Sequence, residues 1–255
     1  MDTLLYGQRA RASATFRDRE LKAIVFDVDG TLYRQGTLRR AMLIRLLAAY
    51  AGHPANGWKT FSALRAYRHA QEQLRGDTSG DVADAQIRLT CQRTNIDRHS
   101  VVACVDRWMQ QEPLAFLPKC IQPGLLPFLQ ACRARGLRLG AISDYPADAK
   151  LLALGIADFF DVSLCAQAPE IDVFKPDPRG LRVALERLGA KPLNSLYVGD
   201  RMDVDAAAAD AAGVSCAILT RPRASHVSSA HVEFASFDHL HGLILGEKCL
   251  RGPVS

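Results

Sequence analysis

Long hydrophobic runs are missing from this 255-residue sequence, and no stretch reaches the roughly 18 apolar residues that a membrane-spanning helix needs. The N-terminal region likewise contains no apolar stretch of signal-peptide length. A cysteine pattern typical of disulfides or metal sites is missing too. None of the seven cysteines stands in a C-x-x-C motif, and their number is odd. We therefore expect a cytoplasmic protein with reduced, mostly buried thiols and no membrane partner.

Low-complexity segments, internal repeats and blocks of lysine and arginine are also absent, although the net charge is +5. The charge is uneven: residues 34–120 hold 13 Lys and Arg against 7 Asp and Glu, a net of +6, and the remainder holds 19 against 20. The basic segment lacks a run of aromatic residues interleaved with basic ones, the pattern that is typical of proteins that bind single-stranded nucleic acid. Nucleic acid is therefore not an expected partner, and the sequence indicates a basic segment in a nearly neutral frame.

What the sequence does contain is an alternation of strand and helix patterns. Short apolar, β-rich runs predict five strands, at 22–28, 137–142, 161–165, 196–198 and 214–219. Helical patterns between them predict helices at 125–135, 146–154, 179–188 and 205–212. Strands joined in this way form right-handed crossovers. We therefore expect an α/β fold with a doubly wound, Rossmann-like parallel sheet of five strands.

Residues 35–121 interrupt this alternation with helical periodicity alone. Apolar residues recur there with helical spacing, which predicts helices that each bury one face. The first of these helices supplies Ala41, Leu43, Ile44, Leu46 and Leu47. We therefore predict a core domain made of residues 1–34 and 122–255, and a helical cap domain made of residues 35–121.

Polar side chains stand at or just after the carboxyl ends of four of the predicted strands. They are Asp27 and Asp29, Ser143 and Asp144, Lys175, and Asp200 and Asp205. Ligands of doubly wound sheets bind at this edge, so we expect these side chains to meet in one crevice. Carboxylates in one crevice raise each other's pKa unless a cation lies among them. Mg²⁺ is the expected cation, because it takes one or two carboxylates together with phosphate and water oxygens.

Four short motifs in this order resemble those of the haloacid dehalogenase-like hydrolase superfamily. They are Asp27-x-Asp29-Gly-Thr, Ser143, Lys175-Pro, and Gly199-Asp200 followed by Asp205. The resemblance covers residues 22–219, and residues 232–240 look like the final strand and helix of that family. The helical insert after the first motif is similar to the cap of the phosphoglycolate-phosphatase-like branch. The resemblance thus implies a hydrolase whose core carries the chemistry and whose cap covers it.

The same resemblance implies catalytic and metal-binding roles. Asp27 is the nucleophile that attacks a phosphate ester and becomes an aspartyl-phosphate, and Asp29 is the general acid and base. Asp27, the backbone carbonyl of Asp29 and the side chain of Asp200 bind Mg²⁺. Asp205 supports the site by ordering metal-bound water or Lys175.

The resemblance implies that the Ser143 hydroxyl and the backbone amide of Asp144 bind the phosphate oxygens, and that Lys175 offsets their charge. Asp144 departs from the family pattern, which usually has Asn at this place. From the residues alone we expect its side chain to cap a helix that begins at Tyr145-Pro146, since Pro is frequent in a first helical turn. Tyr33 follows the first motif closely, so a place in the substrate pocket and a place in the core are equal expectations.

The expected function is hydrolysis of a small phosphorylated metabolite by a phosphatase. A sugar phosphomutase that shares Asp27 and Asp29, and a non-catalytic binding module on the same core, are the alternatives. A dehalogenase fits poorly, because it attacks carbon without a metal and has no use for Asp200. Neither the substrate nor the oligomeric state follows from the sequence, since specificity lies in the cap.

Overall fold

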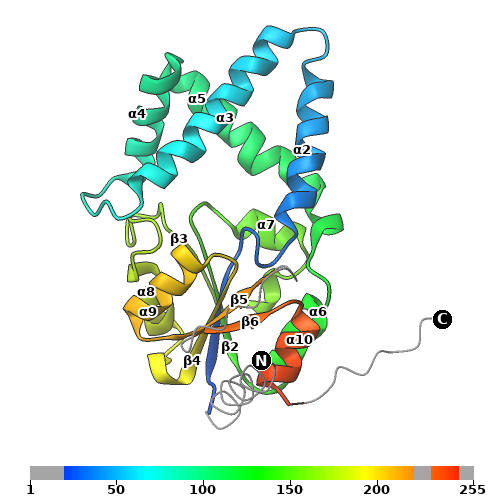
Figure 1. The fold of residues 1–255 in the computed structure, drawn as a ribbon, viewed down its shortest axis with the longest axis vertical. Helices are drawn as coiled ribbons and strands as arrows, with labels where there is room; N and C mark the ends of the chain where they lie inside the picture. Colours follow the sequence, from blue (N-terminus) through cyan, green and yellow to red (C-terminus); the bar gives the residue numbers. More distant parts are fainter. Residues whose placement is uncertain (1–19, 221–230, 247–255) are drawn as a thin grey trace, which may run out of the picture.

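A computed structural model of the protein describes residues 20–220 and 231–246 (Figure 1). Over these residues the chain forms an α/β core, with a group of helices standing on one end of it. None of the described helices is long and apolar enough to cross a membrane. The six cysteines in the described ranges are free thiols, and Cys249 lies outside those ranges.

Parallel strands form one sheet at the centre of the core. They are β1 Ala23–Asp27, β2 Arg138–Ser143, β3 Val162–Cys165, β4 Ser195–Gly199, β5 Ser215–Leu219 and β6 His231–Phe234. Their order is β3-β2-β1-β4-β5-β6, and all neighbours are parallel. The doubly wound fold is confirmed, but the described sheet has six strands rather than the predicted five. The sixth, β6, is a short edge strand that includes His231 and Glu233, so it lacks the apolar run used to find the others. The family resemblance alone placed a final strand and helix in this region, at residues 232–240.

Helices cover both faces of the sheet, because side chains along each strand alternate between the faces. The core helices are α6 Leu125–Ala134, α7 Asp148–Ala153, α8 Arg179–Arg187, α9 Ala207–Ala212 and α10 Phe237–Ile244, with the 3-10 helices η4 Ala157–Phe159 and η5 Pro192–Asn194 and the π-helix η6 Met202–Ala206. Ile24 and Phe26 of β1 pack on the side of α6, α7 and α10. Ala23 and Val25 pack on the side of α8 and α9 (Figure 1). The central strand is therefore buried on both faces, as parallel sheets require.

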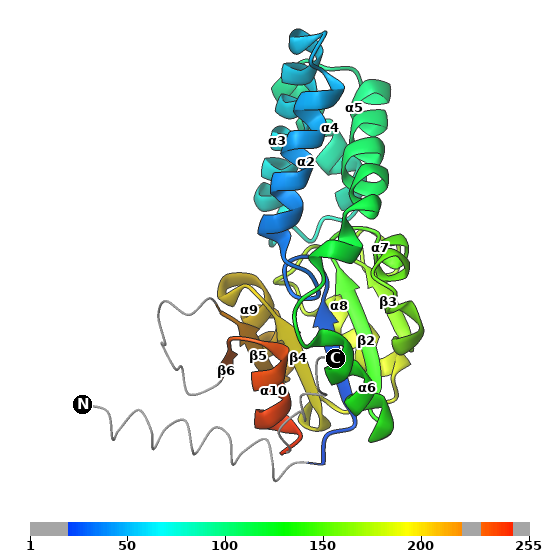
Figure 2. The ribbon, with the colours of Figure 1, turned by 90° about the vertical axis from the view of Figure 1, so that its right-hand side faces the viewer.

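Between β1 and α6 the described chain forms a group of helices above the sheet, called here the cap helices (Figure 2). They are α2 Gln35–Ala49, α3 Pro54–Leu74, α4 Val82–Thr94, α5 Arg98–Val105 and the π-helix η1 Asp106–Gln111, followed by η2 Glu112–Ala115 and η3 Leu117–Cys120. Helices α3, α4 and α5 share a small apolar core that includes Tyr67, Ile87 and Val101. The domain boundaries stay a prediction, and residues 1–19 of the predicted core domain lie outside the described residues.

The face of α2 that was predicted to be buried is buried only in part. Leu46 is 8% exposed, whereas Leu43, Ile44 and Leu47 are 51%, 69% and 63% exposed. Helical spacing identifies residues that share a side of the helix, but it does not show whether another element covers that side.

The cap helices contact the core at the lower end of α3 and the start of α4. Leu74 and Val82 pack in one apolar cluster with Phe174 of the core. The carboxylate of Asp172 accepts the backbone N–H of Asp81 at 2.5 Å and that of Val82 at 2.9 Å. The core thus provides an acceptor for the amides at the start of α4, where a helix leaves its first N–H groups without partners.

Candidate active site

The candidate site lies at the carboxyl end of β1, where the order of the sheet reverses. The chain continues from β1 to β2 on one side and later to β4 on the other, which opens a crevice between their ends. The crevice leads into a cavity of about 590 Å³ between the core and the cap helices. Six of the predicted residues line this cavity: Asp27, Asp29, Asp144, Lys175, Asp200 and Asp205. The seventh, Ser143, donates a hydrogen bond to the carboxylate of Asp29.

Asp27 is the last residue of β1, and donors hold both oxygens of its carboxylate. Lys175 Nζ donates to Oδ1 at 2.5 Å, and Thr31 Oγ1 donates to Oδ2 at 2.9 Å. Burial raises the pKa of Asp27 well above its usual value; Lys175 opposes this, while Asp205 and Asp200 add to it. The anionic form of Asp27 therefore depends on the positive charge placed near it.

Asp205 fixes the position of Lys175. Its Oδ1 accepts Lys175 Nζ at 2.8 Å and the Tyr197 hydroxyl at 3.1 Å. Its Oδ2 accepts the backbone N–H groups of Asp200 and Arg201 at 3.1 and 3.0 Å. Both oxygens of Asp205 are therefore occupied, and Asp205 lies where a support for Lys175 was expected.

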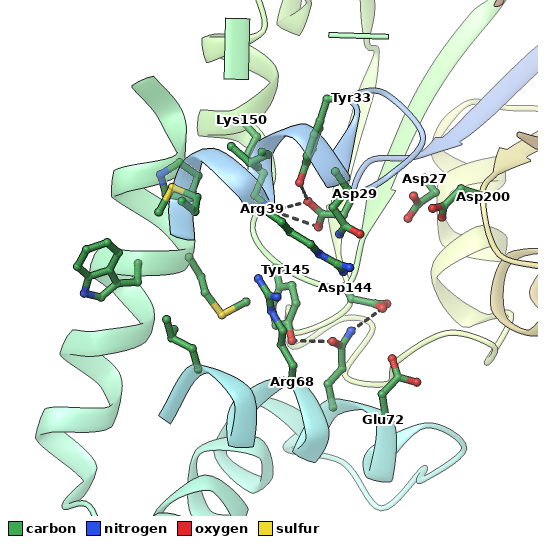
Figure 3. Close-up of a pocket in the computed structure, with 18 of the residues that line it drawn as sticks. Asp27, Asp29, Tyr33, Arg39, Arg68, Glu72, Asp144, Tyr145, Lys150 and Asp200 are labelled. Carbon is green, nitrogen blue, oxygen red and sulfur yellow. Dashed lines mark hydrogen bonds and ion pairs between the residues drawn. The ribbon is translucent and has the colours of Figure 1, made fainter. Parts of the chain in front are cut away.

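Asp200 follows β4 and lies beside Asp27 (Figure 3). Gly30 packs against it so closely that a Cβ at position 30 would lie 2.2 Å from Asp200 Oδ2, and the φ of +111° also favours glycine. Within the described ranges no group donates a hydrogen bond to the Asp200 carboxylate. Burial, together with the charge of Asp205, raises the pKa of Asp200 to about 6.

These carboxylates form a group that could hold a metal ion. Single oxygens of Asp27, Asp200 and Asp205 lie within 4.8 Å of one another. Asp205 already has four donors, whereas Asp200 has none among the described residues. A half-buried carboxylate without a donor, next to a second carboxylate, fits a hard divalent cation such as Mg²⁺. Burial and the neighbouring carboxylates raise the pKa values of Asp27 and Asp200, and a cation bound between the two would lower both.

Asp29 is held by side chains from three other parts of the chain. The Tyr33 hydroxyl donates to Oδ1, and Ser143 Oγ donates to Oδ2 at 3.1 Å. Lys150 Nζ donates to Oδ1 at 2.8 Å and to Oδ2 at 3.1 Å. Burial raises the pKa of Asp29, but the Lys150 charge and these hydrogen bonds outweigh burial, so the pKa is lowered. Tyr33 is thus buried and at the site at once, so its two expected places are the same place.

Lys150 was missed by sequence reasoning. It lies on the short helix α7 and is only 6% exposed, which is rare for a lysine. A single lysine in a helix is normally solvated, and no fixed spacing connects it to the second motif. The usable signal was its place in the first turn of the helix that follows Ser143.

Asp144 does not cap the helix after β2, and that prediction was wrong. Helix α7 begins at Asp148, after Ala147, and has no side-chain cap. The Asp144 carboxylate instead accepts Gln71 Nε2 at 2.7 Å and Arg75 Nη2 at 3.0 Å, both from α3. A charged guanidinium competes well for a carboxylate, because charge-assisted hydrogen bonds are stronger than neutral ones.

Arg75 and Glu72 connect α3 to the loops of the core. Besides its bond to Asp144, Arg75 Nη1 donates to the backbone carbonyl of Lys175 at 2.6 Å. Glu72 pairs with Arg75 at 3.0 Å and with Arg201 at 2.8 Å. Arg75 and Asp144 are about nine-tenths buried, whereas Glu72 and Arg201 are partly exposed. The buried Arg75–Asp144 pair therefore contributes more to holding the cap helices on the core than the exposed Glu72–Arg201 pair does.

Three other arginines of the cavity, Arg39, Arg65 and Arg68, have no such partner among the described residues. Arg39 of α2 and Arg68 of α3 point into the cavity (Figure 3), and neither contacts an acceptor within the described residues. Burial and the like charge of Arg68 lower the pKa of Arg39. An anion between these two guanidinium groups would relieve their repulsion.

Comparison with known proteins identifies similar hydrolases. A family model described as a haloacid dehalogenase-like hydrolase matches residues 21–213. The chain is 33% identical to a glyceraldehyde 3-phosphate phosphatase of Methanopyrus kandleri. The 197 aligned residues cover 76% of this chain and 82% of that protein. The chain is 27% identical over 234 residues to a phosphoglycolate phosphatase of Cereibacter sphaeroides, which covers 88% and 98%.

A solved structure of a 2-haloacid dehalogenase from Pseudomonas syringae pv. Tomato DC3000 has a similar fold. The TM-score is 0.61 at 20% sequence identity, over 89% of this chain and 99% of that one. At this level of identity the likeness extends to the fold alone.

Proposed function

The chain belongs to the haloacid dehalogenase-like hydrolase family and is a phosphatase, and we propose that it hydrolyses a small phosphate monoester with Mg²⁺ as its cofactor. The observation that carries the proposal is the surroundings of Asp27. Its buried carboxylate ends β1, accepts the Lys175 ammonium and lies beside Asp200, which has no donor among the described residues. This arrangement supports the roles of Asp27 as nucleophile and of Asp200 as a metal ligand.

In the proposed reaction, an oxygen of Asp27 attacks phosphorus and the bond from phosphorus to the ester oxygen breaks. The leaving alkoxide takes a proton from Asp29, which gives an aspartyl-phosphate and the free alcohol. Asp29 then takes a proton from a water whose oxygen attacks the same phosphorus, and this releases phosphate and restores Asp27. The anionic state of Asp29 suits the base step, and an arriving phosphate dianion raises its pKa for the acid step.

The remaining groups bind and neutralise the phosphate. Ser143, the Asp144 amide and Lys175 are proposed to hold its oxygens. Asp27, the backbone carbonyl of Asp29 and Asp200 are proposed to bind Mg²⁺, which when bound supplies positive charge between nucleophile and phosphate.

We propose that residues 35–121 act as the cap domain over a core of residues 1–34 and 122–255. Arg39 and Arg68 would attract the anionic substrate from the cap side of the cavity. The cytoplasmic location expected from the sequence stays a prediction.

Phosphate release from p-nitrophenyl phosphate and a panel of phosphorylated metabolites tests the proposal. Activity should require Mg²⁺, disappear in EDTA and return when Mg²⁺ is added. Asp27→Asn should abolish release, because an amide cannot attack phosphorus. Asp203→Asn is the matched control and should retain activity, since Asp203 is exposed and does not line the cavity. Full activity in EDTA, or a fully active Asp27→Asn variant, would contradict the mechanism.

Product analysis separates the phosphatase from the sugar phosphomutase that shares Asp27 and Asp29. A phosphatase releases inorganic phosphate in a 1:1 ratio with the alcohol, whereas a mutase transfers the phosphoryl group to another hydroxyl. No described feature favours the mutase.

A further inference from the structure

Two cap helices each line the cavity with an arginine followed by large apolar side chains. On α2 these are Arg39, Leu43 and Leu46, and on α3 they are Arg68, Leu64 and Phe61. The chain leaves the core along α2 and returns to it along α3 (Figure 1). By residue number, each arginine therefore lies nearer the core than the apolar residues of its series. Spacings of three and four residues keep each series on one side of its helix.

Beyond Arg39 and Arg68, the residues of α2 and α3 that line the cavity over two helical turns are apolar except Arg65. At about 1.5 Å per residue, Leu43 and Leu64 lie about 6 Å beyond the arginines along the helix axes, and Leu46 and Phe61 lie about 10 Å beyond them. Met109 of the π-helix η1 lines the same cavity. We call this part of the cavity, lined by Leu43, Leu46, Phe61, Leu64 and Met109, the apolar chamber.

Two of its residues leave apolar surface exposed in the cavity, although the ring of Phe61 also contacts Trp58. Leu43 is 51% exposed and Phe61 is 40% exposed, although both line the cavity. Apolar side chains exposed in a concave surface are typical of ligand sites.

The apolar chamber is present while the cap helices are already held on the core. Arg75 pairs with Asp144 at 3.0 Å, and Glu72 pairs with Arg201 at 2.8 Å. The cavity still measures about 590 Å³, within the range of ~300–1,000 Å³ for pockets that bury drug-sized ligands. A substrate made only of phosphate and a few polar atoms would leave the chamber's apolar walls in contact with water.

We propose that the apolar chamber binds a hydrocarbon part of the substrate, so that the substrate is a phosphate monoester of an alcohol with an alkyl or aryl body. The inference rests on the proposed function for the position of the phosphate at Asp27. It sets this chain apart from a phosphatase of two- and three-carbon phosphates, because the leaving group is expected to extend past Arg39 and Arg68.

The test measures binding and hydrolysis along one homologous series. Calorimetry with Mg²⁺ gives the Kd of n-alkylphosphonates from ethyl to hexyl, whose carbon–phosphorus bond this reaction does not break. Burying a methylene strengthens binding by up to about fourfold, so hexylphosphonate should bind at least about tenfold more tightly than ethylphosphonate. The kcat/KM values of the matching alkyl phosphates should rise in parallel.

Leu43→Ser and Phe61→Ser should reduce the hexyl-to-ethyl ratio of Kd values by several-fold. Both residues are exposed, so their replacement leaves the packed core of the protein intact. Ile44→Ser is the matched control, because Ile44 is 69% exposed on the same helix but does not line the cavity. It should leave the ratio unchanged.

The two hypotheses fail in different ways. A Kd that does not change with chain length would overturn the apolar chamber, even if every phosphate ester is hydrolysed. Phosphonate binding that strengthens with chain length, without hydrolysis of any ester, would overturn the proposed function alone. A stable dimer that Leu43→Ser and Ile44→Ser both dissociate would assign these residues to an interface between two copies and would also overturn the chamber.

Discussion

Removing divalent cations should make the stability of this protein depend on pH through Asp200. The pKa of Asp200 is about 6 in the folded protein, against a usual value of 3.8. The folded state therefore binds this proton more tightly than the unfolded state does. Its contribution to stability is fully present below about pH 4 and is lost as the pH rises through 6.

The size of the effect follows from the shift. A difference of about two pKa units corresponds to about 3 kcal/mol of unfolding free energy. For a chain of this length, 1 kcal/mol changes Tm by about 2–4 °C, so the full effect is roughly 6–12 °C. Asp29 has the opposite effect on stability, because its pKa is lowered in the folded protein. Its stabilising contribution is present above about pH 4 and is lost only below that pH, outside the pH range of the assay.

Thermal unfolding in EDTA from pH 4.5 to 7.5 measures this effect as the Tm difference between wild type and Asp200→Asn. The wild type should lose stability relative to the variant as the pH rises, because only the wild type acquires the buried charge. Added Mg²⁺ should stabilise the wild type above pH 6 and the variant much less, since a ligand that binds only the folded state raises Tm. Asp203→Asn, which alters an exposed carboxylate in the neighbouring helix η6, should follow the wild type. A Tm difference that stays constant or rises with pH would refute the reasoning.

Three further predictions concern the neighbours of the nucleophile. Asp29→Asn should lower kcat by roughly 10²-fold or more on alkyl phosphates and much less on p-nitrophenyl phosphate, whose leaving group needs little protonation; equal losses on both would exclude the acid role. Lys150→Met should raise the pKa of Asp29 by removing the charge that lowers it, so the acidic limb of the kcat–pH profile should move upward, and an unchanged profile would argue against the contact. Arg75→Ala should cost about 3 kcal/mol in urea unfolding, because it leaves the nine-tenths buried Asp144 carboxylate without its charged partner, and a loss below 0.5 kcal/mol would contradict that burial.

The sheet and its polar edge could be predicted because their signals are local. β1 is a run of apolar residues that ends at Asp27, and a turn with Gly30 follows directly. The alternation of strands and helices then determines that Asp27, Lys175 and Asp200 follow strands of one parallel sheet. Such strands bring their carboxyl ends to one edge, so the meeting of these residues follows from topology without knowledge of any distance.

The contacts of Asp144 could not be predicted in the same way. Its partners Gln71 and Arg75 lie about seventy residues earlier in the chain, and their approach depends on how α3 lies over the core. Among residues close in sequence, the only expected partner of the Asp144 side chain was the start of the following helix, so a helix cap was predicted. Lys150 was missed for the same reason, because its partner Asp29 is 121 residues away.

The two hydrogen bonds that Arg75 donates to the core have a consequence for the timing of catalysis. One guanidinium reaches both the loop after β2, through Asp144, and the loop after β3, through the carbonyl of Lys175. These loops carry groups to which we assign the phosphate, so lifting α3 would release both at once. In an open molecule the phosphate-binding groups would then be out of place, and the site would not catalyse hydrolysis. Substrate enclosure and assembly of the catalytic machinery would be one event, and product escape would take it apart again.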